Sequence, residues 1–361
     1  MSEMPEPTAI YDIEKTYLEN AQKGPFFEGI TPPRNMPDKQ DWIDFLGFKI
    51  ASPIGIPAGP LLNSKWIELS ANLGFDILTY KTIRSHAHSS HPLPNVVPIT
   101  TQGPLLPGHL PEYVMQNAHP KNLSLENLGI TNSFGNPSFP PEYLQKDIPL
   151  ANSTLREGQV MIVSIFGTSH NGVDIVDDFA DTALFAKECG AQIIEANYSC
   201  PNVADDEGSL YSSPDAVYEF SSRIVKAIGD TPLIIKVGAF PDISCMKQTF
   251  LAAAKAGVHA ICGLNTVSMK VFNKNMQPAL GPNRITCGIC GTPIHEAALE
   301  FTRQARKIID QEKLDLTLLA TGGATRPHHL QEFLDEGADI AMTATGMMWD
   351  PYLAMRFHDG E

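Results

Sequence analysis

A repeated alternation of short apolar runs and longer amphipathic stretches constrains this fold most strongly. The apolar runs lie at residues 53–58, 76–81, 160–166, 192–197, 233–237, 259–263, 317–321 and 339–343. Helical periodicity fills most of the intervals, at residues 177–188, 214–227, 246–256, 295–310 and 328–336. Near-continuous apolar strings are typical of parallel strands that are covered on both faces.

Eight strands with intervening helices predict an α/β fold, namely a (β/α)8 TIM barrel. An open doubly wound sheet is the alternative, but the last strands are not followed by the GxGxxG turn of a dinucleotide-binding unit. We expect residues 1–45 to form an N-terminal extension with a helix over residues 11–22, and residues 46–361 to form the barrel. A stretch from about 85 to 158 is too long for an ordinary loop and is expected to cover the C-terminal face of the barrel.

Charge and cysteine content narrow the class of protein. The formal net charge is -15 and the basic residues are scattered, so we expect no nucleic-acid partner. Six cysteines in 361 residues indicate reduced thiols rather than a disulfide framework. The sequence shows neither a signal peptide nor an apolar window of membrane-spanning length, so we expect a soluble, cytoplasmic protein without a membrane span.

Polar and small residues follow several of the predicted strands, at the barrel end where active sites lie. The fourth strand ends at Asn197 and continues as Tyr198-Ser199-Cys200-Pro201-Asn202. The other informative strand ends are Ala58-Gly59, Lys81-Thr82, Asn265-Thr266, Thr321-Gly322-Gly323 and Ala344-Thr345. These residue types are not those that strand propensity selects, which indicates a functional site at this end.

Lys236 stands inside the apolar run 233–237. A charged lysine within a core strand is costly unless it is paired. It is either paired with an internal carboxylate or directed at a ligand that carries or develops negative charge. Its place at the top of an inner strand favours the ligand.

The last two strands lead into turns of small residues that expose backbone N–H groups. Gly322 and Gly323 follow the seventh strand, and Ala344 follows the eighth. Loops after these two strands form the usual phosphate site of such barrels. The turns therefore predict a bound phosphate, with two ordinary tight turns as the alternative.

In this order the motifs resemble those of the dihydroorotate dehydrogenase family, a set of FMN-containing (β/α)8 barrels. The resemblance covers roughly residues 46–349 and is most specific in the string from Asn197 to Asn202. The further matching pieces are Pro92-Leu93-Pro94, Asn132-Ser133-Phe134-Gly135, Lys236 and residues 288–291.

The resemblance implies which residues hold the cofactor and which hold the substrate. For FMN it implies Ala58, Gly59, Lys81, Thr82, Asn197, Lys236, Gly288, Gly291, Gly322, Gly323, Ala344 and Thr345. For a small pyrimidine substrate it implies Lys81, Asn132, Phe134, Gly135, Asn197, Asn202, Asn265 and Thr266. Amide side chains suit such a ring because each offers both a donor and an acceptor. Lys236 would lie near the N1/C2 edge of the isoalloxazine and favour the reduced state.

The implied reaction is the oxidation of dihydroorotate to orotate in pyrimidine biosynthesis. Flavin N5 would accept a hydride from C6 of the substrate, and Cys200 would take the proton from C5. Cysteine at this position is similar to the soluble class of the family and serine to the membrane-bound quinone class. Soluble relatives imply a homodimer. The electron acceptor stays open among fumarate, a nicotinamide through a partner subunit, and a quinone; no metal is expected.

Departures from the family's pattern put the substrate in doubt. The turn at residues 287–291 carries a Cys-x-x-Cys pair, Cys287 and Cys290, for which a redox or metal role is conceivable. The substrate loop continues as Asn136-Pro137-Ser138 rather than with an apolar residue and asparagine. Three histidines cluster in the long stretch, where a solvated loop is favoured over a metal site: His86, His88 and His91.

Other functions therefore stay open. One is a related flavin barrel that acts on another dihydropyrimidine or unsaturated cyclic substrate. Another is a flavin-free phosphate-binding barrel, an isomerase or an aldolase with Lys236 as a Schiff-base lysine. The last is a barrel that binds a ligand without turnover.

Overall fold

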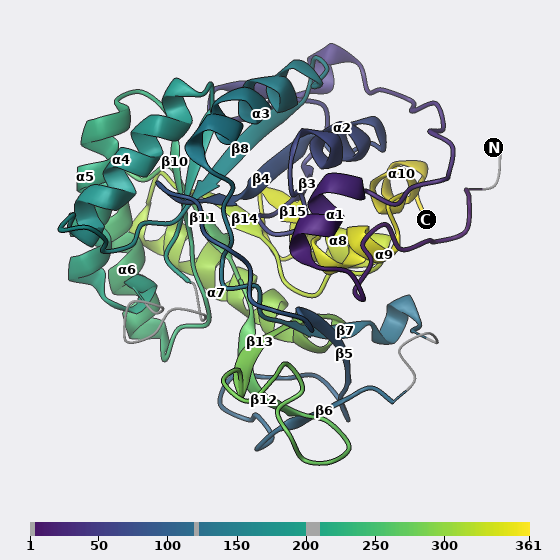
Figure 1. Ribbon diagram of the computed structural model, residues 1–361. Helices are drawn as coiled ribbons and strands as arrows, with labels where there is room; N and C mark the ends of the chain where they lie inside the picture. The colour runs from purple at the N-terminus through teal and green to yellow at the C-terminus, as the bar shows by residue number, and fades with distance from the viewer. Residues whose placement is uncertain (1–3, 119–122, 200–209) are drawn as a thin grey trace.

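A closed barrel of eight parallel strands lies at the centre of the computed structural model, which describes residues 4–118, 123–199 and 210–361 (Figure 1). The strands are β3 (Ile54–Ile56), β4 (Ile77–Ile83), β8 (Val160–Ile165), β9 (Ile193–Asn197), β10 (Leu233–Lys236), β11 (Ala260–Gly263), β14 (Thr317–Ala320) and β15 (Ile340–Met342). Each pairs in parallel with the next, and β15 pairs with β3. All eight predicted strands are thus confirmed, and the open sheet is excluded.

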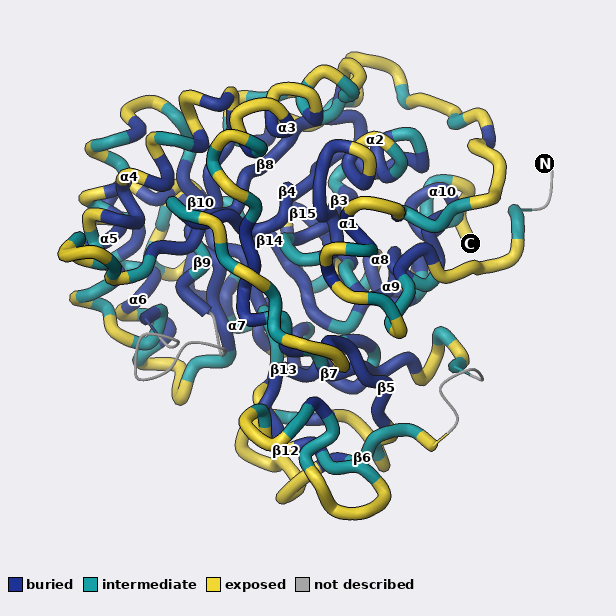
Figure 2. Tube along the Cα trace, in the orientation of Figure 1, coloured by how far each residue is buried: buried dark blue, intermediate teal, exposed yellow. Residues whose placement is uncertain are grey.

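Helices surround the barrel and bury their apolar faces against it (Figure 2). They are α2 (Ser64–Asn72), α3 (Pro141–Ser153), α4 (Ile175–Glu188), α5 (Pro214–Ile228), α6 (Ile243–Ala256), α7 (His295–Glu312), α8 (Pro327–Asp335), α9 (Thr345–Trp349) and α10 (Leu353–Asp359). The five predicted helices are confirmed, with ends shifted by three residues or fewer. Among the described residues, no helix combines the length and the apolar character that a bilayer crossing needs.

A short hairpin closes the end of the barrel where its strands begin. The hairpin strands are β1 (Ile43–Phe45) and β2 (Phe48–Ile50). Phe45 and Ile50 pack into one apolar cluster with inward side chains of the barrel, among them Ile77, Ile193 and Ile234. This end of the barrel is therefore a filled apolar floor, and a ligand site must lie at the opposite end.

A second sheet, whose five strands close on themselves, extends from the barrel and is built from two separate segments (Figure 1). The first segment supplies β5 (Val96–Thr100), β6 (Val114–Gln116) and β7 (Gly129–Asn132), which belong to the long stretch 85–158. The second follows β11 and supplies β12 (Val267–Phe272) and β13 (Thr286–Gly291). Strand β13 pairs with β7 and places Gly288 opposite Asn132. The long stretch also contains α3, and the excursion after β11 was not predicted from sequence.

The N-terminal extension holds one helix, α1 (Tyr17–Lys23), and the expected start near Tyr11 is wrong. Thr16 ends the extended segment because it forms a capping box with Glu19. Its hydroxyl accepts the Glu19 N–H at 3.2 Å, while the Glu19 carboxylate accepts the Thr16 N–H at 3.0 Å. Upstream, the Ile10 N–H donates to the Met348 carbonyl at 2.9 Å, which fixes the extension against α9. Three 3₁₀ turns complete the described elements: η1 (Lys39–Asp41), η2 (Leu125–Asn127) and η4 (Thr292–Ile294).

Candidate active site

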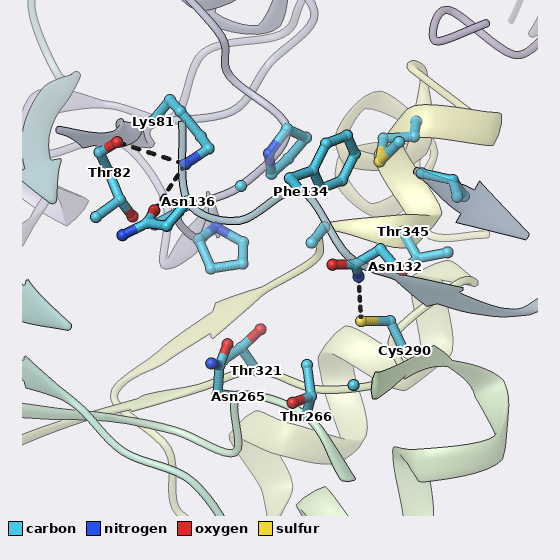
Figure 3. Close-up of a pocket in the computed structure, with 18 of the residues that line it drawn as sticks. Lys81, Thr82, Asn132, Phe134, Asn136, Asn265, Thr266, Cys290, Thr321 and Thr345 are labelled. Carbon is cyan, nitrogen blue, oxygen red and sulfur yellow. Dashed lines mark hydrogen bonds between the residues drawn. The ribbon is translucent and has the colours of Figure 1, made fainter. Parts of the chain in front are cut away.

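A cavity of about 1100 Å³ lies at the carboxyl ends of the barrel strands, between them, the second sheet and the N-terminal extension. Most residues that the sequence singled out line it (Figure 3). They are Ala58, Gly59, Lys81, Thr82, Asn132, Phe134, Asn197, Lys236, Asn265, Thr266, Gly288, Ala344 and Thr345. The strand-end residues thus converge on one pocket, as the barrel topology predicts.

Six predicted residues do not line this cavity or cannot be placed in it. Cys200 and Asn202 lie outside the described residues. Gly135, Gly291, Gly322 and Gly323 are described but are not among the lining residues.

Gly322 and Gly323 have a packing reason to be glycine. Both have positive φ, 122° and 83°. A Cβ on Gly323 would lie 2.5 Å from the backbone nitrogen of His295, so the turn packs directly against the start of α7. This agrees with the tight-turn alternative, and the phosphate role stays a prediction.

Several lining residues were not predicted from sequence to belong to the site: Tyr11, Tyr17, Asn136, Cys290 and Met348. Asn136 and Cys290 stand where the sequence departs from the family's pattern, and that departure was a usable signal. Tyr11 and Tyr17 come from the N-terminal extension, which no local pattern connects to the barrel mouth. Their rings pack against Phe134, with centroid distances of 6.3 and 6.1 Å.

The loop after β7 presents backbone N–H groups to the pocket. Gly135 and Asn136 both have positive φ, 74° and 52°. The Phe134 carbonyl accepts the His91 N–H at 2.9 Å, and the Gly135 carbonyl accepts from Arg84 at 3.1 Å. Since the C=O and N–H of one peptide point in opposite directions, the N–H groups of Gly135 and Asn136 point away from these two partners.

The same N–H groups have no acceptor of their own in the described parts of the chain. Those of Phe134, Gly135 and Asn136 make no hydrogen bond there. Phe134 and Asn136 line the pocket, whereas Arg84 and His91 do not. Successive N–H groups in such turns form a concavity that binds anions. We call residues 134–136 the anion loop.

Lys81 adds a positive charge beside the anion loop. Its Nζ donates to Asn136 Oδ1 at 3.1 Å, and its side chain is buried (Figure 3). Lys236 enters the pocket from β10 and is also buried. Burial acts to lower the pKa of Lys236, but Cys262, Glu195 and Cys290 act more strongly in the opposite direction, so the pKa lies above its ordinary value. The pocket therefore contains two ammonium groups.

Amide side chains from three elements organise the rest of the pocket. Asn265 Nδ2 donates to the Ser199 carbonyl at 2.7 Å, and the Ser199 N–H donates to Asn197 Oδ1 at 3.1 Å. Asn132 Nδ2 donates to Cys290 Sγ at 3.3 Å (Figure 3). The two bonds of Ser199 hold this residue, which directly precedes Cys200, at the carboxyl end of β9.

The Cys-x-x-Cys pair is not a redox pair in this structure. Cys287 and Cys290 are three residues apart on β13, so their side chains leave opposite faces of the sheet. Cys287 packs against Val97 and Leu280, whereas Cys290 lines the pocket. Both thiols are free, and burial raises the pKa of Cys290 to about 11.

The histidines do not form the metal site that their spacing permitted. His91 packs over Gly135, while the His86 ring lies 4.5 Å from that of His170. Within the described residues, one group has metal-binding spacing: His295, His329 and Glu332. The Thr325 N–H donates to His329 Nδ1 at 3.2 Å, which leaves the ring proton on Nε2. That proton occupies the nitrogen that a metal would need.

Comparisons with known proteins agree with this geometry. The family model described as dihydroorotate dehydrogenase matches residues 111–360. A dihydroorotate dehydrogenase of Dictyostelium discoideum is 48% identical over 99% of this chain and 98% of its own length. Dihydroorotate dehydrogenase A (fumarate) of Limosilactobacillus reuteri is 27% identical over 63% of this chain and 66% of its own.

More distant similarities mark the breadth of the family. The NAD-dependent dihydropyrimidine dehydrogenase subunit PreA of Escherichia coli is 28% identical over 53% of this chain and 45% of its own. A crystal structure of the Eimeria tenella dihydroorotate dehydrogenase, in complex with ferulenol, superposes with a TM-score of 0.70 at 16% identity, over 91% of this chain and 85% of that one. The extent of the family match and the whole-length similarity at 48% identity show that this chain belongs to the dihydroorotate dehydrogenase family.

Proposed function

We propose that this protein oxidises dihydroorotate to orotate with FMN as its bound cofactor, as a step of pyrimidine biosynthesis. The observation that carries the proposal is the anion loop of residues 134–136, which faces a pocket lined by amide side chains and two buried ammonium groups. A planar ring with alternating C=O and N–H groups and one carboxylate matches this set of donors and acceptors.

The pocket residues fit FMN. Small residues, amide side chains and two lysines line the pocket, a set that suits a planar polar ring system. Lys236 presents a buried cation, which favours a ring that gains negative charge on reduction. We propose that Ala58, Gly59, Lys81 and Thr82 contact the ring and chain of FMN. For its phosphate we propose Gly291, Gly322, Gly323, Ala344 and Thr345, with Asn197 and Gly288 nearer the ring.

The anion loop separates dihydroorotate from dihydropyrimidines that lack a carboxylate. Its three N–H groups need an acceptor, and a substrate carboxylate beside Lys81 would supply one. A dihydropyrimidine without that group would leave buried donors unpaired, and such sites reject the analogue strongly. The relative PreA nevertheless makes a dihydropyrimidine the substrate to compare.

The residues around β9 support a proposal for the proton transfer. We propose that Cys200 takes the proton from C5, that Asn132, Asn197, Asn202, Asn265 and Thr266 hold the ring, and that FMN supplies hydride acceptance when bound. The hydrogen bonds from Asn265 to Ser199 and from Ser199 to Asn197 fix the chain immediately before Cys200. A Schiff-base role for Lys236 is disfavoured, because that chemistry needs a lowered pKa.

Anaerobic titration of the flavin absorbance with dihydroorotate tests the proposal. The wild-type protein should purify with or take up FMN and be bleached by dihydroorotate but not by dihydrouracil. Cys200→Ala should bind FMN normally and be reduced about 10²–10⁴-fold more slowly. Cys245→Ala, a thiol on α6 away from the pocket, is the matched control. A protein that binds no FMN would refute the proposal, and unchanged reduction of Cys200→Ala would remove that residue from its role.

We further propose a cytoplasmic homodimer, in keeping with the soluble class that Cys200 indicates. Sedimentation equilibrium should then give twice the chain mass of 39.4 kDa. Reoxidation of the reduced protein by fumarate, a nicotinamide and a quinone in turn identifies the electron acceptor.

A further inference from the structure

Glu195 is a buried acidic residue in the barrel interior that the reaction described above does not use. It lies on β9 two residues before Asn197 and is fully buried. Alternate residues of a strand share a face, so Glu195 points the same way as Ile193. Ile193 packs in the interior cluster of the barrel together with Ile234 and Cys262. Glu195 therefore projects into the barrel, between the apolar floor and the pocket.

The strand register places Glu195 next to Lys236. Glu195 pairs with Ile234 on β10, and Lys236 is two residues further along β10 on the same face. Lys236 is itself opposite Cys262 on β11. Glu195 is thus the diagonal inner-face neighbour of Lys236, one layer closer to the floor.

Neither carboxylate oxygen of Glu195 accepts a hydrogen bond from an N–H or O–H group in the parts of the chain that the structure describes, and only a weak thiol donor, Cys262, lies close enough to interact with it. The buried carboxylate of Asp147 provides a contrast. It accepts hydrogen bonds from the Ser64 N–H at 2.8 Å and from Tyr80 Oη at 2.6 Å. A buried charge without such partners is strongly unfavourable unless an opposite charge lies close by.

Among the residues that the structure describes, the titratable groups around Lys236 leave Glu195 as its counter-charge. Besides Glu195, the residues that face it are Cys262 from β11, Cys290 from β13 and, in the same pocket, Lys81 from β4. Burial raises the pKa of Cys262 to about 12 and that of Cys290 to about 11, so both thiols are uncharged at neutral pH. Lys81 is a cation and repels Lys236. Among these groups, Glu195 alone supplies negative charge.

We propose that Glu195 is the buried counter-ion of Lys236 and a positioning residue for the reaction. Its carboxylate keeps the Lys236 ammonium charged and in place at the base of the pocket. In turn, the positive charge of Lys236 compensates the buried negative charge of Glu195. These two residues make no salt bridge in the structure, so the proposed pairing rests on the strand register, on the burial of both side chains and on the electrostatic effect of Glu195 on Lys236. Its effect on the cofactor rests on the proposed function.

A double-mutant cycle tests the ion pair without reference to any cofactor. Glu195→Gln leaves a buried ammonium unpaired and Lys236→Met leaves a buried carboxylate unpaired, so each should lower the denaturation midpoint. The double variant removes both charges and should be more stable than either single variant. Thr79→Val, which removes a buried hydroxyl of the same interior without changing charge, is the matched control. A double variant no more stable than its weaker parent would overturn the proposal, even where a single variant fails to fold.

The midpoint potential of the bound flavin as a function of pH tests the positioning role. The Glu195 carboxylate acts to raise the pKa of Lys236, so in Glu195→Gln the Lys236 proton should leave at a lower pH than in the wild type. Below that pH the variant's potential should exceed the wild-type value, because the carboxylate no longer opposes the reduced anion. Above it the potential should fall below the wild-type value, because the cation is lost.

The crossover distinguishes the pair from a general packing role, which would shift the potential by a similar amount at every pH. Parallel curves for Glu195→Gln and the wild type would overturn the positioning role. Failure of the wild-type protein to take up FMN would instead refute the proposed function. The double-mutant cycle would still decide whether Glu195 and Lys236 stabilise each other.

Discussion

At the scale of single residues, the anion loop owes its shape to a side chain outside the pocket. Arg84 is buried, and its guanidinium donates to two successive carbonyls, that of Gly135 at 3.1 Å and that of Asn136 at 2.9 Å. It also lies over the Phe166 ring, 5.2 Å from the centroid. A planar guanidinium can hold two acceptors in a fixed geometry, which a lysine could not. Arg84 therefore determines which way the free N–H groups point.

Replacing Arg84 should weaken substrate binding more than it slows chemistry. Arg84→Met removes two charged hydrogen bonds from the loop, each worth about 1.5–3 kcal/mol. We expect KM for dihydroorotate to rise about 10–100-fold with kcat changed far less, as measured by steady-state kinetics. Arg156→Met, an exposed arginine that contacts Asn72, should leave KM unchanged. An unaltered KM in Arg84→Met with full flavin content would contradict this role.

At the scale of elements, the N-terminal extension covers the pocket, and one asparagine fixes the turn inside it. Asn20 on α1 is fully buried. Its side-chain amide donates to the Asp12, Lys15 and Thr16 carbonyls, and its Oδ1 accepts the Asp12 N–H at 2.9 Å. These bonds fix the turn that places Tyr11 and Tyr17 against Phe134.

Asn20→Ala should release this cover. Loss of several buried hydrogen bonds, each worth about 1 kcal/mol net, should lower the free energy of unfolding by about 2–3 kcal/mol in urea denaturation. Quenching of flavin fluorescence by iodide should increase because the N-terminal extension uncovers the pocket more often. Thr8→Ala in the exposed part of the same segment should change neither quantity. Equal quenching in Asn20→Ala and the wild type would show that the extension does not shield the pocket.

The elements also show what could be predicted from sequence. The barrel strands could be predicted, because strands that are buried on both faces have near-continuous apolar sequences. The second sheet could not, since its pairing of β7 with β13 joins Asn132 to Gly288, more than 150 residues away. The strand-end residues of the pocket were predicted because they directly follow recognisable strands. Tyr11 was missed because its contact with the pocket is long-range. The start of α1 could have been predicted from sequence, because Thr16 and Glu19 have the residue types and spacing of a capping box.

At the scale of the whole molecule, a stack of histidines makes stability depend on pH. The ring centroids of His295 and His329 lie 4.2 Å apart at the contact of α7 with α8. Burial, assisted by His295, His328 and Arg326, lowers the pKa of His329 to about 3. The unfolded chain binds this proton near pH 6.5, so the stability that neutral His329 contributes is present above that pH and is lost as pH falls toward 3.

Removing this histidine should flatten the acid side of the stability curve. His329→Asn keeps an acceptor for the Thr325 N–H but cannot take up a proton. Between about pH 6 and pH 4 its free energy of unfolding should decline less steeply than that of the wild type, by up to about 1.4 kcal/mol per pH unit. Gln331→Asn, which changes an exposed, non-titrating side chain on the same helix, should retain the wild-type slope. Equal slopes in the wild type and His329→Asn would contradict the prediction.

The apolar floor built by the β1–β2 hairpin divides the barrel's sequence into two regions that can be varied independently. Side chains such as Phe45, Ile50 and Ile340 pack in one apolar cluster with inward residues of the barrel strands, and no member of that cluster lines the pocket. A library randomised over the floor could therefore be screened for heat resistance without sacrificing turnover. A library over the strand ends would explore new substrates on an unchanged foundation. Because of the hairpin, thermal stability and catalytic activity can be engineered at separate sets of residues.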